Sequence, residues 1–332
     1  HSVDEVGHRV LDETGRILRD NLYGNIEEDV WRRDFTANAL YYNIRDFSVW
    51  DYVDGVPHAQ SRELRMIGDP ETRYREDPVR MLRAVRFAAK LDFIIHEATE
   101  APIYELAYLL DNIPPARLFD EVCKMMLAGS AEASVAQLQR LELLSHLMPG
   151  VADALDSAPE DVGARLLQLG LEGTDARVAR DKPVTPAFLF AVLLWPALLD
   201  ELGTPSGPLT QEPKSLLTAF EKVLRVQLQR IAIPKRFSLP MRDIIMMQPR
   251  FERRTGRRVL RFLEQRNFRA AYDFLLLRAA SGEADPDVAE WWTRLQEMSP
   301  EQREAEVGAS GGDSAGKTRR RPRRRRRRSP TT

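Results

Sequence analysis

Helical patterns dominate the chain from Glu71 to about residue 300. Apolar residues recur there at the three- and four-residue spacing of amphipathic helices, and no convincing strand pattern interrupts them. Pro234 and Pro240 are expected to break helices. A chain with this pattern must fold mostly as packed helices. The expected helices cover residues 77–91, 98–111, 115–128, 132–145, 187–201, 213–231, 239–248, 256–264, 267–280 and 286–297.

The segment from His1 to Pro70 has a mixed α/β pattern. Apolar positions at helical spacing run from Ile26 to Tyr42, whereas Phe47 to Val53 alternates in the two-residue period of a strand. Asp54-Gly55 is typical of the turn that follows a strand, and a second short strand is expected from Glu63 to Ile67. This segment therefore predicts the end of a sheet domain.

Size and composition favour more than one packed unit. The chain has 332 residues, of which 43% are apolar, so it can bury a substantial core. The segment from Pro149 to Thr185 is rich in Gly, Asp, Pro and Ala, and is predicted to join two helical subdomains.

The chain shows no sign of a membrane-spanning segment. Its most apolar stretch, Pro186 to Leu199, is shorter than the roughly 20 residues that such a helix needs and is broken by Pro196. The single cysteine, Cys123, lies in an apolar helical pattern, which favours a buried thiol and a reducing compartment. We therefore predict a cytoplasmic protein without a membrane partner.

Positive charge is concentrated at the C-terminal end. Ten of the 49 basic residues and no acidic residue lie between Lys317 and Arg328, so the remainder has 39 basic against 50 acidic residues, a net charge of −11. Such a segment has little apolar surface to bury and is predicted to be disordered, and its charge favours binding to RNA phosphates. A solvated tail that only aids solubility is the alternative. The predicted RNA-binding residues are Lys317, Arg319, Arg320, Arg321, Arg323, Arg324, Arg325, Arg326, Arg327 and Arg328.

The first motif with a chemical meaning is Arg32-Arg33-Asp34-Phe35-Thr36-Ala37-Asn38-Ala39-Leu40. On a helix, Asp34 and Asn38 would be four residues apart and would share a face. Arginine binds phosphate through a planar fork of donors, and Asp with Asn can bind ribose hydroxyls or position a triphosphate. The alternative is a solvated helix on which the Asp and Arg side chains pair with each other.

The second motif runs from Arg73 to Phe87 and reads Arg-Tyr-Arg-Glu-Asp-Pro-Val-Arg-Met-Leu-Arg-Ala-Val-Arg-Phe. Asp77-Pro78 is typical of a helix start, and Asp77, Arg80 and Arg83 then recur at three-residue spacing along one side. A carboxylate beside a guanidinium offers the acceptors and donors that reading the Watson–Crick edge of a base requires. An ion-paired surface helix is the alternative.

Together and in this order, the two motifs resemble the paired signature of class II nucleotidyltransferases. This superfamily contains bacterial poly(A) polymerases and tRNA CCA-adding enzymes. The resemblance extends through Ile113 to Glu121 and through Ile233 to Arg236, and it weakens across roughly 150–180 and beyond about 300. It implies an α+β fold made of the C-terminal part of a nucleotidyltransferase α/β head, all-α neck and body domains, and a disordered Arg-rich tail. The implied boundaries are 1–70 for the head, 71–130 for a neck that recognises the nucleotide and base, 131–305 for an RNA-binding body, and 306–332 for the tail.

The resemblance also implies roles for single residues. Asp34 would be catalytic, and the side chains beside it would contact the triphosphate and ribose of the incoming nucleotide. Asp77 and Arg80 would act as an amino-acid template that selects the base, assisted by Arg83. The implied nucleotide-binding residues are Arg32, Arg33, Asn38, Asp77, Arg80 and Arg83.

Within the superfamily, three features favour a poly(A) polymerase: the segment from Leu18 to Gly24, the motif from Arg73 to Pro78 and the Arg-rich tail. Such an enzyme adds 3′ poly(A) to RNA from ATP without a nucleic-acid template. In bacteria the resemblance implies messenger RNA polyadenylation linked to RNA decay, with RNA 3′ ends, ATP and RNA-decay proteins as partners. A CCA-adding tRNA nucleotidyltransferase and a non-catalytic RNA-binding module are the alternatives.

Nucleotidyl transfer needs two Mg²⁺ ions held by carboxylates. The family places these on an Asp-x-Asp motif that we expect upstream of residue 1, so the chain alone is expected to bind RNA and ATP weakly without polymerising. Asp285-Pro286-Asp287 has the spacing, but its proline argues against a ligand-bearing strand. Gly311-Gly312-Asp313 lies on the approach to the tail, and His58 has no partner at metal-ligand spacing.

Overall fold

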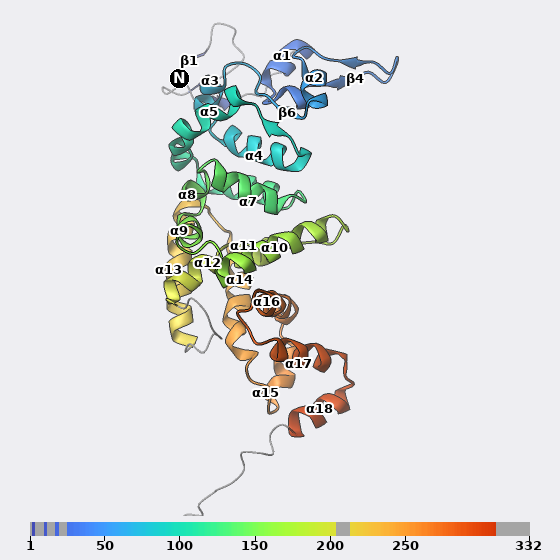
Figure 1. Ribbon diagram of the computed structural model, residues 1–332, viewed down its shortest axis with the longest axis vertical. Coiled ribbons are helices and arrows are strands. Elements are labelled where there is room, and N and C mark those ends of the chain that lie inside the picture. The colour runs from blue at the N-terminus through green and yellow to red at the C-terminus, as the bar shows by residue number, and fades with distance from the viewer. Residues whose placement is uncertain (1, 4–9, 12–16, 20–24, 204–212, 310–332) are drawn as a thin grey trace, which may run out of the picture.

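The computed structural model describes residues 2–3, 10–11, 17–19, 25–203 and 213–309. These residues form an elongated molecule, with a small α/β region at one end and helices that follow one another along the long axis to the other end (Figure 1). The prediction of an α+β fold in which helices dominate after Pro70 is confirmed. Within the described residues, no helix is long and apolar enough to cross a membrane.

The α/β region is built from short strands and helices. Three of its strands form an antiparallel sheet in the order β1-β2-β3, and β4 pairs antiparallel with β5. β6 pairs in parallel with β7, which lies beyond the following two helices. The bounds are β1 Ser2–Val3, β2 Val10–Leu11, β3 Ile17–Arg19, α1 Ile26–Arg32, η1 Thr36–Asn38, β4 Tyr41–Tyr42, β5 Val49–Trp50, α2 Gly55–Gln60, β6 Glu63–Leu64 and β7 Ile94–Ile95.

Two predictions for this region were wrong in extent. The helix expected from Ile26 to Tyr42 ends at Arg32, because Phe35 is drawn into an extended conformation and forms a bridge with Met66. The strand expected over 47–53 is confined to β5, because the carboxylate of Asp51 accepts hydrogen bonds from the amides of residues 53, 55 and 56 and turns the chain into α2.

The helices α3 and α4 and the strand β7 connect the α/β region to the helical part of the molecule. The sequence predicted no strand after Glu71, so β7 corrects that prediction; two residues are too few to give a period-two signal. β6, α3, α4 and β7 therefore form a parallel β-helix-helix-β unit that crosses residue 70. The bounds of this part are α3 Pro70–Glu76, α4 Val79–Leu91, α5 Glu97–Leu106, η2 Ala107–Asn112 and α6 Pro115–Met126.

The remaining helices follow one another along the long axis, and several of them contact more than one other helix. α10 contacts α7, α11, α12 and α16, and α14 packs against α11 and α16 (Figure 1). The bounds are α7 Ala131–Arg140, α8 Leu144–Leu147, α9 Pro149–Ser157, α10 Val162–Val178, α11 Pro186–Leu193, α12 Trp195–Leu202, α13 Pro213–Arg230, α14 Lys235–Met247, η3 Gln248–Arg250, α15 Arg258–Leu263, α16 Phe268–Ser281, α17 Pro286–Glu297 and α18 Pro300–Ala309.

The segment between 149 and 185, which was predicted to join two helical subdomains, is itself largely helical. It forms α9 and α10, and its glycines permit close helix packing: a Cβ on Gly170 would lie 2.4 Å from the Cγ1 atom of Val192. Pro240 was wrongly predicted as a breaker, because it lies inside α14, whereas Pro234 stands immediately before that helix as expected.

Replacing Gly170 by Ala tests this packing. Val192 is fully buried and its branched side chain is stiff, so the added methyl group would clash with it. On the same helix, a Cβ on Gly173 would meet nothing within 4 Å, so Gly173→Ala is the matched control and should stabilise by up to about 1 kcal/mol through helix propensity. We expect Gly170→Ala to be less stable than Gly173→Ala by about 1–3 kcal/mol in urea unfolding. Equal stability of the two variants would contradict the packing described here.

Candidate functional site

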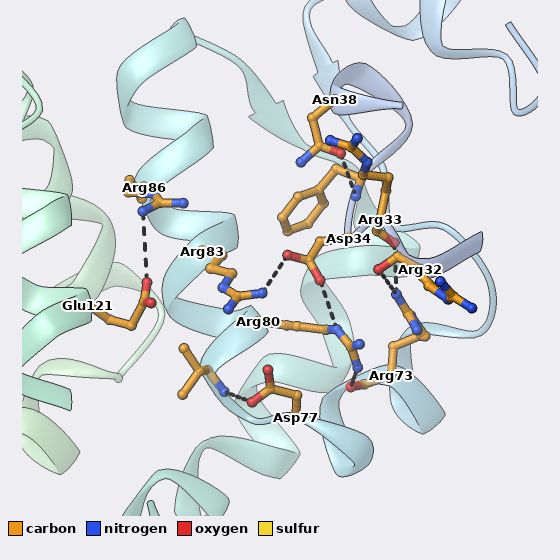
Figure 2. A network of polar contacts seen from close by, with 12 residues as sticks. Arg32, Arg33, Asp34, Asn38, Arg73, Asp77, Arg80, Arg83, Arg86 and Glu121 are labelled. Carbon is orange, nitrogen blue, oxygen red and sulfur yellow. Dashed lines mark hydrogen bonds and ion pairs between the residues drawn. The ribbon is translucent and has the colours of Figure 1, made fainter. Parts of the chain in front are cut away.

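The backbone around Asp34 is fixed by pairing with the segment at β6. The Thr36 amide donates to the Arg65 carbonyl at 2.9 Å, and the Ile67 amide donates to the Asp34 carbonyl at 3.0 Å. Phe35 is fully buried between these contacts. Because side chains alternate along an extended segment, Asp34 points away from the Phe35 side and toward α4 (Figure 2).

Two arginines of α4 hold the Asp34 carboxylate. Nε of Arg80 donates to Oδ1 at 2.9 Å, and Nη1 of Arg83 donates to Oδ2 at 2.9 Å (Figure 2). Positions 80 and 83 lie about one helical turn apart, so both side chains face Asp34. The Arg80 side chain is only 4% exposed and that of Asp34 is 12% exposed. The two sequence motifs therefore meet in a nearly buried ionic contact.

α3 completes the network through residues that the sequence analysis did not select. Nη1 of Arg80 also donates to the Arg73 carbonyl at 2.7 Å and to Oε2 of Glu76 at 3.0 Å. Arg73 in turn donates to the same Glu76 oxygen and to the Arg33 carbonyl. The spacing of Arg73, Glu76 and Arg80 by three and four residues was the signal that could have identified them.

Asp77, which the resemblance implied would select the base together with Arg80, pairs with Arg117. α4 begins at Val79, so Asp77 precedes the helix, and its Oδ2 accepts a hydrogen bond from Nη2 of Arg117 at 2.7 Å. Its other oxygen accepts from the Val79 amide at 3.3 Å. Arg117 was not predicted as a site residue, because its partner lies far away in the sequence and no local pattern connects them.

The other predicted residues of the first motif lie apart from the Asp34 carboxylate. Arg33 turns back to α1 and pairs with Asp29 at 3.0 Å, while the Asn38 side chain accepts from the Phe35 amide at 3.3 Å. Arg32 ends α1 and lies to the side of the network (Figure 2). The prediction that Asp34 and Asn38 share a helical face was therefore wrong, since Asp34 is not helical and Asn38 lies in η1.

The network keeps Asp34 ionised. Burial raises the pKa of its carboxyl, but the charges of Arg83 and Arg80 and their hydrogen bonds outweigh burial and hold the pKa below its ordinary value. Burial lowers the pKa of Arg83, and the Asp34 charge outweighs that effect, so the pKa is raised. Among the arginines that contact Asp34, Glu76 or Asp77, Arg83 and Arg117 have the most exposed side chains, at 28% and 39%.

The described residues do not fit a metal ion. No group of three or more His, Cys, Asp or Glu side chains within them could hold one, and both carboxylate oxygens of Asp34 are bound by arginine. His58 instead contacts the Thr36 hydroxyl at 3.0 Å, and Asp285 caps α17.

Two further predictions concern residues outside the network. Burial raises the pKa of the Cys123 thiol to about 11, which fits a structural side chain better than a nucleophile. The Gly311-Gly312-Asp313 segment and the predicted RNA-binding residues of the tail, from Lys317 to Arg328, lie outside the described residues.

Comparison with known proteins gives three family matches. Residues 5–65 match the poly A polymerase head domain, residues 92–155 match the "probable RNA and SrmB-binding site of polymerase A", and residues 210–328 match the "polymerase A arginine-rich C-terminus". The poly(A) polymerase I of Salmonella typhimurium is 42% identical over 312 residues, which cover 92% of this chain and 67% of that protein. The chain thus spans about two thirds of the length of that relative.

More distant similarities connect the chain with CCA-adding enzymes. The CCA-adding enzyme of Limosilactobacillus reuteri is 39% identical over 130 residues, which cover 39% of this chain and 32% of that enzyme. The crystal structure of the Bacillus stearothermophilus CCA-adding enzyme in complex with CTP matches with a TM-score of 0.53 at 24% identity, covering 86% of this chain and 60% of that one. At that identity, the structural match shows a shared fold.

The ionic contact of Asp34 should depend on pH. Because the folded-state pKa of Asp34 lies below its ordinary value of about 3.9, the contact stabilises the protein above that pH and is lost as the pH falls through the folded pKa. Asp34→Asn should therefore lower the free energy of unfolding at pH 7 by up to about 3–5 kcal/mol, the range for a buried ion pair that loses one partner, while Glu76 still pairs with Arg80. The difference from the wild type should shrink below about pH 4.

The control for this prediction is Asp92→Asn. Asp92 also pairs with an arginine, Arg62, at 3.0 Å, but the two side chains are 91% and 68% exposed. Its loss should cost at most about 1 kcal/mol. Urea unfolding of the three proteins from pH 7 to pH 3.5 measures both effects, and a deficit of Asp34→Asn that stays constant over this range would rule out the ionic contact as its source.

Proposed function

We propose a template-independent polynucleotide adenylyltransferase function for this chain, because it belongs to the family of bacterial poly(A) polymerase I. In this proposal the protein transfers AMP from ATP to RNA 3′ ends. The chain supplies the residues that bind the nucleotide and the RNA.

The contact of Asp34 with Arg80 and Arg83 is the observation that carries the nucleotide-binding part of the proposal. It brings the two motifs together although 46 and 49 residues separate the partners in sequence. Asp34 was predicted to be catalytic; in this proposal it acts as a positioning residue that fixes the two arginines. Arg83 and Arg117 lie at the accessible side of the network and suit the phosphates of ATP, since guanidinium groups bind phosphate through paired donors.

Base selection is proposed to use Asp77 and Arg80, as the sequence resemblance implied. In the structure these side chains are bound to Arg117 and Asp34, and Arg80 is almost fully buried. Reading a base would therefore require both to exchange partners when a nucleotide binds. Arg32, Arg33 and Asn38 are proposed to line the ribose and triphosphate side, with Arg33 leaving Asp29.

RNA binding is assigned to two parts of the chain in this proposal. The family match over residues 92–155 supports contact with RNA in the helical part, and the ten basic residues of the tail supply attraction to phosphates of any sequence. The head, neck, body and tail boundaries at 70, 130 and 305 stay predictions. A cytoplasmic location, a role in RNA decay and RNA-decay proteins as partners stay predictions too.

A CCA-adding activity is the second candidate, because the similarities include CCA-adding enzymes. Primer extension separates the two activities, using the protein extended at its N-terminal end to include the expected Asp-x-Asp motif. It is offered ATP alone, CTP alone or both, on an unstructured RNA and on a tRNA that lacks its CCA end. Long tails from ATP alone on the unstructured RNA are the expected result. Addition that stops after two C and one A on the tRNA would move the assignment to a CCA-adding enzyme, and failure on both substrates would leave only RNA binding.

Whether residues 1–332 polymerise on their own is a separate point. From the sequence we expect them to bind RNA and ATP weakly without polymerising. The same primer-extension assay with residues 1–332 alone tests this expectation. Mg²⁺-dependent incorporation of AMP by these residues would contradict it.

A substitution of Asp77 tests the proposed base selection. We expect Asp77→Ala to weaken ATP binding and to leave CTP binding nearly unchanged, so that the discrimination between the two falls by about 1–3 kcal/mol, the range for one lost bidentate base contact. Titration calorimetry with each nucleotide measures this without turnover. Glu71→Ala removes a carboxylate from the exposed pair with Arg75 on α3 and should change neither affinity. An equal loss of affinity for ATP and CTP in Asp77→Ala would argue against base reading.

A further inference from the structure

A dense positive surface lies at the end of the molecule remote from the Asp34 network. Residues 250–269 contain eight arginines and two glutamates, a net charge of +6, in a chain that carries −11 outside its tail. All eight arginines are exposed. We call this set the α15 basic surface: Arg250, Arg253, Arg254, Arg257, Arg258, Arg261, Arg266 and Arg269.

These arginines are not neutralised by neighbouring acids. Within the part of the chain that the structure describes, Arg269 is the member of the set with an ion-pair partner, Asp273 at 3.0 Å. Arg250 donates to the Gln265 side chain and stacks over the Phe262 ring at 4.2 Å. Unpaired exposed guanidinium groups at this density repel one another, so the surface favours an anionic partner.

The backbone under the surface is held rigidly. Phe251, Phe262, Phe268 and Trp292 pack edge to face or tilted, with ring centroids 4.9–5.7 Å apart. Between Arg254 and Arg257 the chain turns at Gly256, whose φ of +86° suits glycine and whose amide donates to the Val307 carbonyl of α18. The Cα positions of the arginines on both sides of this turn are therefore fixed by the packing beneath them.

The surface adjoins a cavity of about 390 Å³ between α10 and α16. Arg266 and Arg269 belong to both, and Arg177 adds a third guanidinium, while Phe188 and Leu277 supply apolar walls. The volume falls within the roughly 300–1,000 Å³ range of small-ligand sites. Gly173 leaves part of the cavity open, because it has no side chain there.

We propose that the α15 basic surface and this cavity together bind single-stranded RNA, as a site separate from the Arg-rich tail. The arginines contact successive phosphates, and the cavity receives one unstacked base against its apolar wall. Single-stranded RNA fits because its bases can be splayed out, whereas a duplex keeps them stacked. The inference rests on the proposed function, which makes RNA the substrate.

The position of the surface determines which RNA can use it. α15 lies near the opposite end of the long axis from α4, which carries the Asp34 network (Figure 1). A strand whose 3′ end reaches that network must extend along the helical body to touch α15. The surface therefore strengthens the binding of a long RNA whose 3′ end lies at the Asp34 network. It adds little to the binding of an oligonucleotide of a few nucleotides at that network.

Charge reversal on the surface tests the proposal in the full chain. The variant is Arg254→Glu with Arg257→Glu, and the matched control is Lys214→Glu with Arg225→Glu, two exposed basic residues of α13. Fluorescence anisotropy with a labelled unstructured 25-nucleotide RNA gives Kd over a range of salt concentrations. We expect Kd to rise at least about tenfold in the surface variant and its salt slope to fall by about 1.4, at roughly 0.7 per lost phosphate contact on a single strand. The control should resemble the wild type.

Gly173→Leu tests the cavity. The leucine fills space that is empty and also favours helix formation, so the fold should survive, as circular dichroism would check. We expect weaker binding of the single-stranded RNA and unchanged binding of a duplex of the same length. Ala176→Leu, on an exposed position of α10 that does not line the cavity, is the control and should alter neither.

The outcomes separate this inference from the proposed function. If the wild-type chain fails to bind the 25-nucleotide RNA, the proposed function fails with it. If the wild type binds and the Arg254→Glu, Arg257→Glu variant matches it in Kd and salt slope, the α15 surface is not an RNA site and the proposed function stands. Unchanged single-strand binding by Gly173→Leu would remove the cavity from the proposal.

Discussion

The contact between the Asp34 carboxylate and the guanidinium groups of Arg80 and Arg83 joins the α/β region to the helical part of the molecule. Charges this deeply buried need an opposite charge and hydrogen-bond partners, because removing them from water is costly. Glu76 and the Arg73 carbonyl provide the remaining partners of Arg80, so α3 is held in the same arrangement. One carboxylate thereby sets the relative positions of three segments, and the residues proposed to meet the nucleotide depend on it.

The helical body contains a second buried ion pair, which also joins separate helices. Arg278 and Glu283 pair at 3.1 Å with side chains that are each 1% exposed, and the Trp195 indole donates to Glu283 at 2.8 Å. Burial raises the pKa of the Glu283 carboxyl despite the charge of Arg278. This junction binds α12 to the end of α16, away from any residue implicated in nucleotide binding. Burial of an ion pair in this chain is thus no sign of catalysis by itself.

The sequence predicted the fold where the physical signal is local and failed where distant partners decide. Amphipathic spacing identified most helices from α4 to α17. The motif resemblance selected Asp34, Arg80 and Arg83 as site residues, although it did not predict that they contact one another. The end of α1 was misplaced because Phe35 pairs with Met66, which lies beyond α2 in the sequence. Gly163 and Gly170 lie in the segment that was predicted to join two subdomains because of its composition, and the structure uses them for close packing of α10. The ion pair of Arg117 with Asp77 could not be predicted, because two residues far apart in the sequence produce no periodic pattern that connects them.

The parallel pairing of β6 with β7 has a consequence for the order of folding. Leu64 cannot meet Ile95 until α3 and α4 have been synthesised and folded back, since both helices lie in the connection between the strands. At roughly 5–20 residues per second, the ribosome needs about 2–6 s to make that connection. Contacts between distant residues also form more slowly than helices do. The Asp34 carboxylate therefore leaves the ribosome seconds before Arg80 and Arg83 and has neither of these partners until α4 has been made.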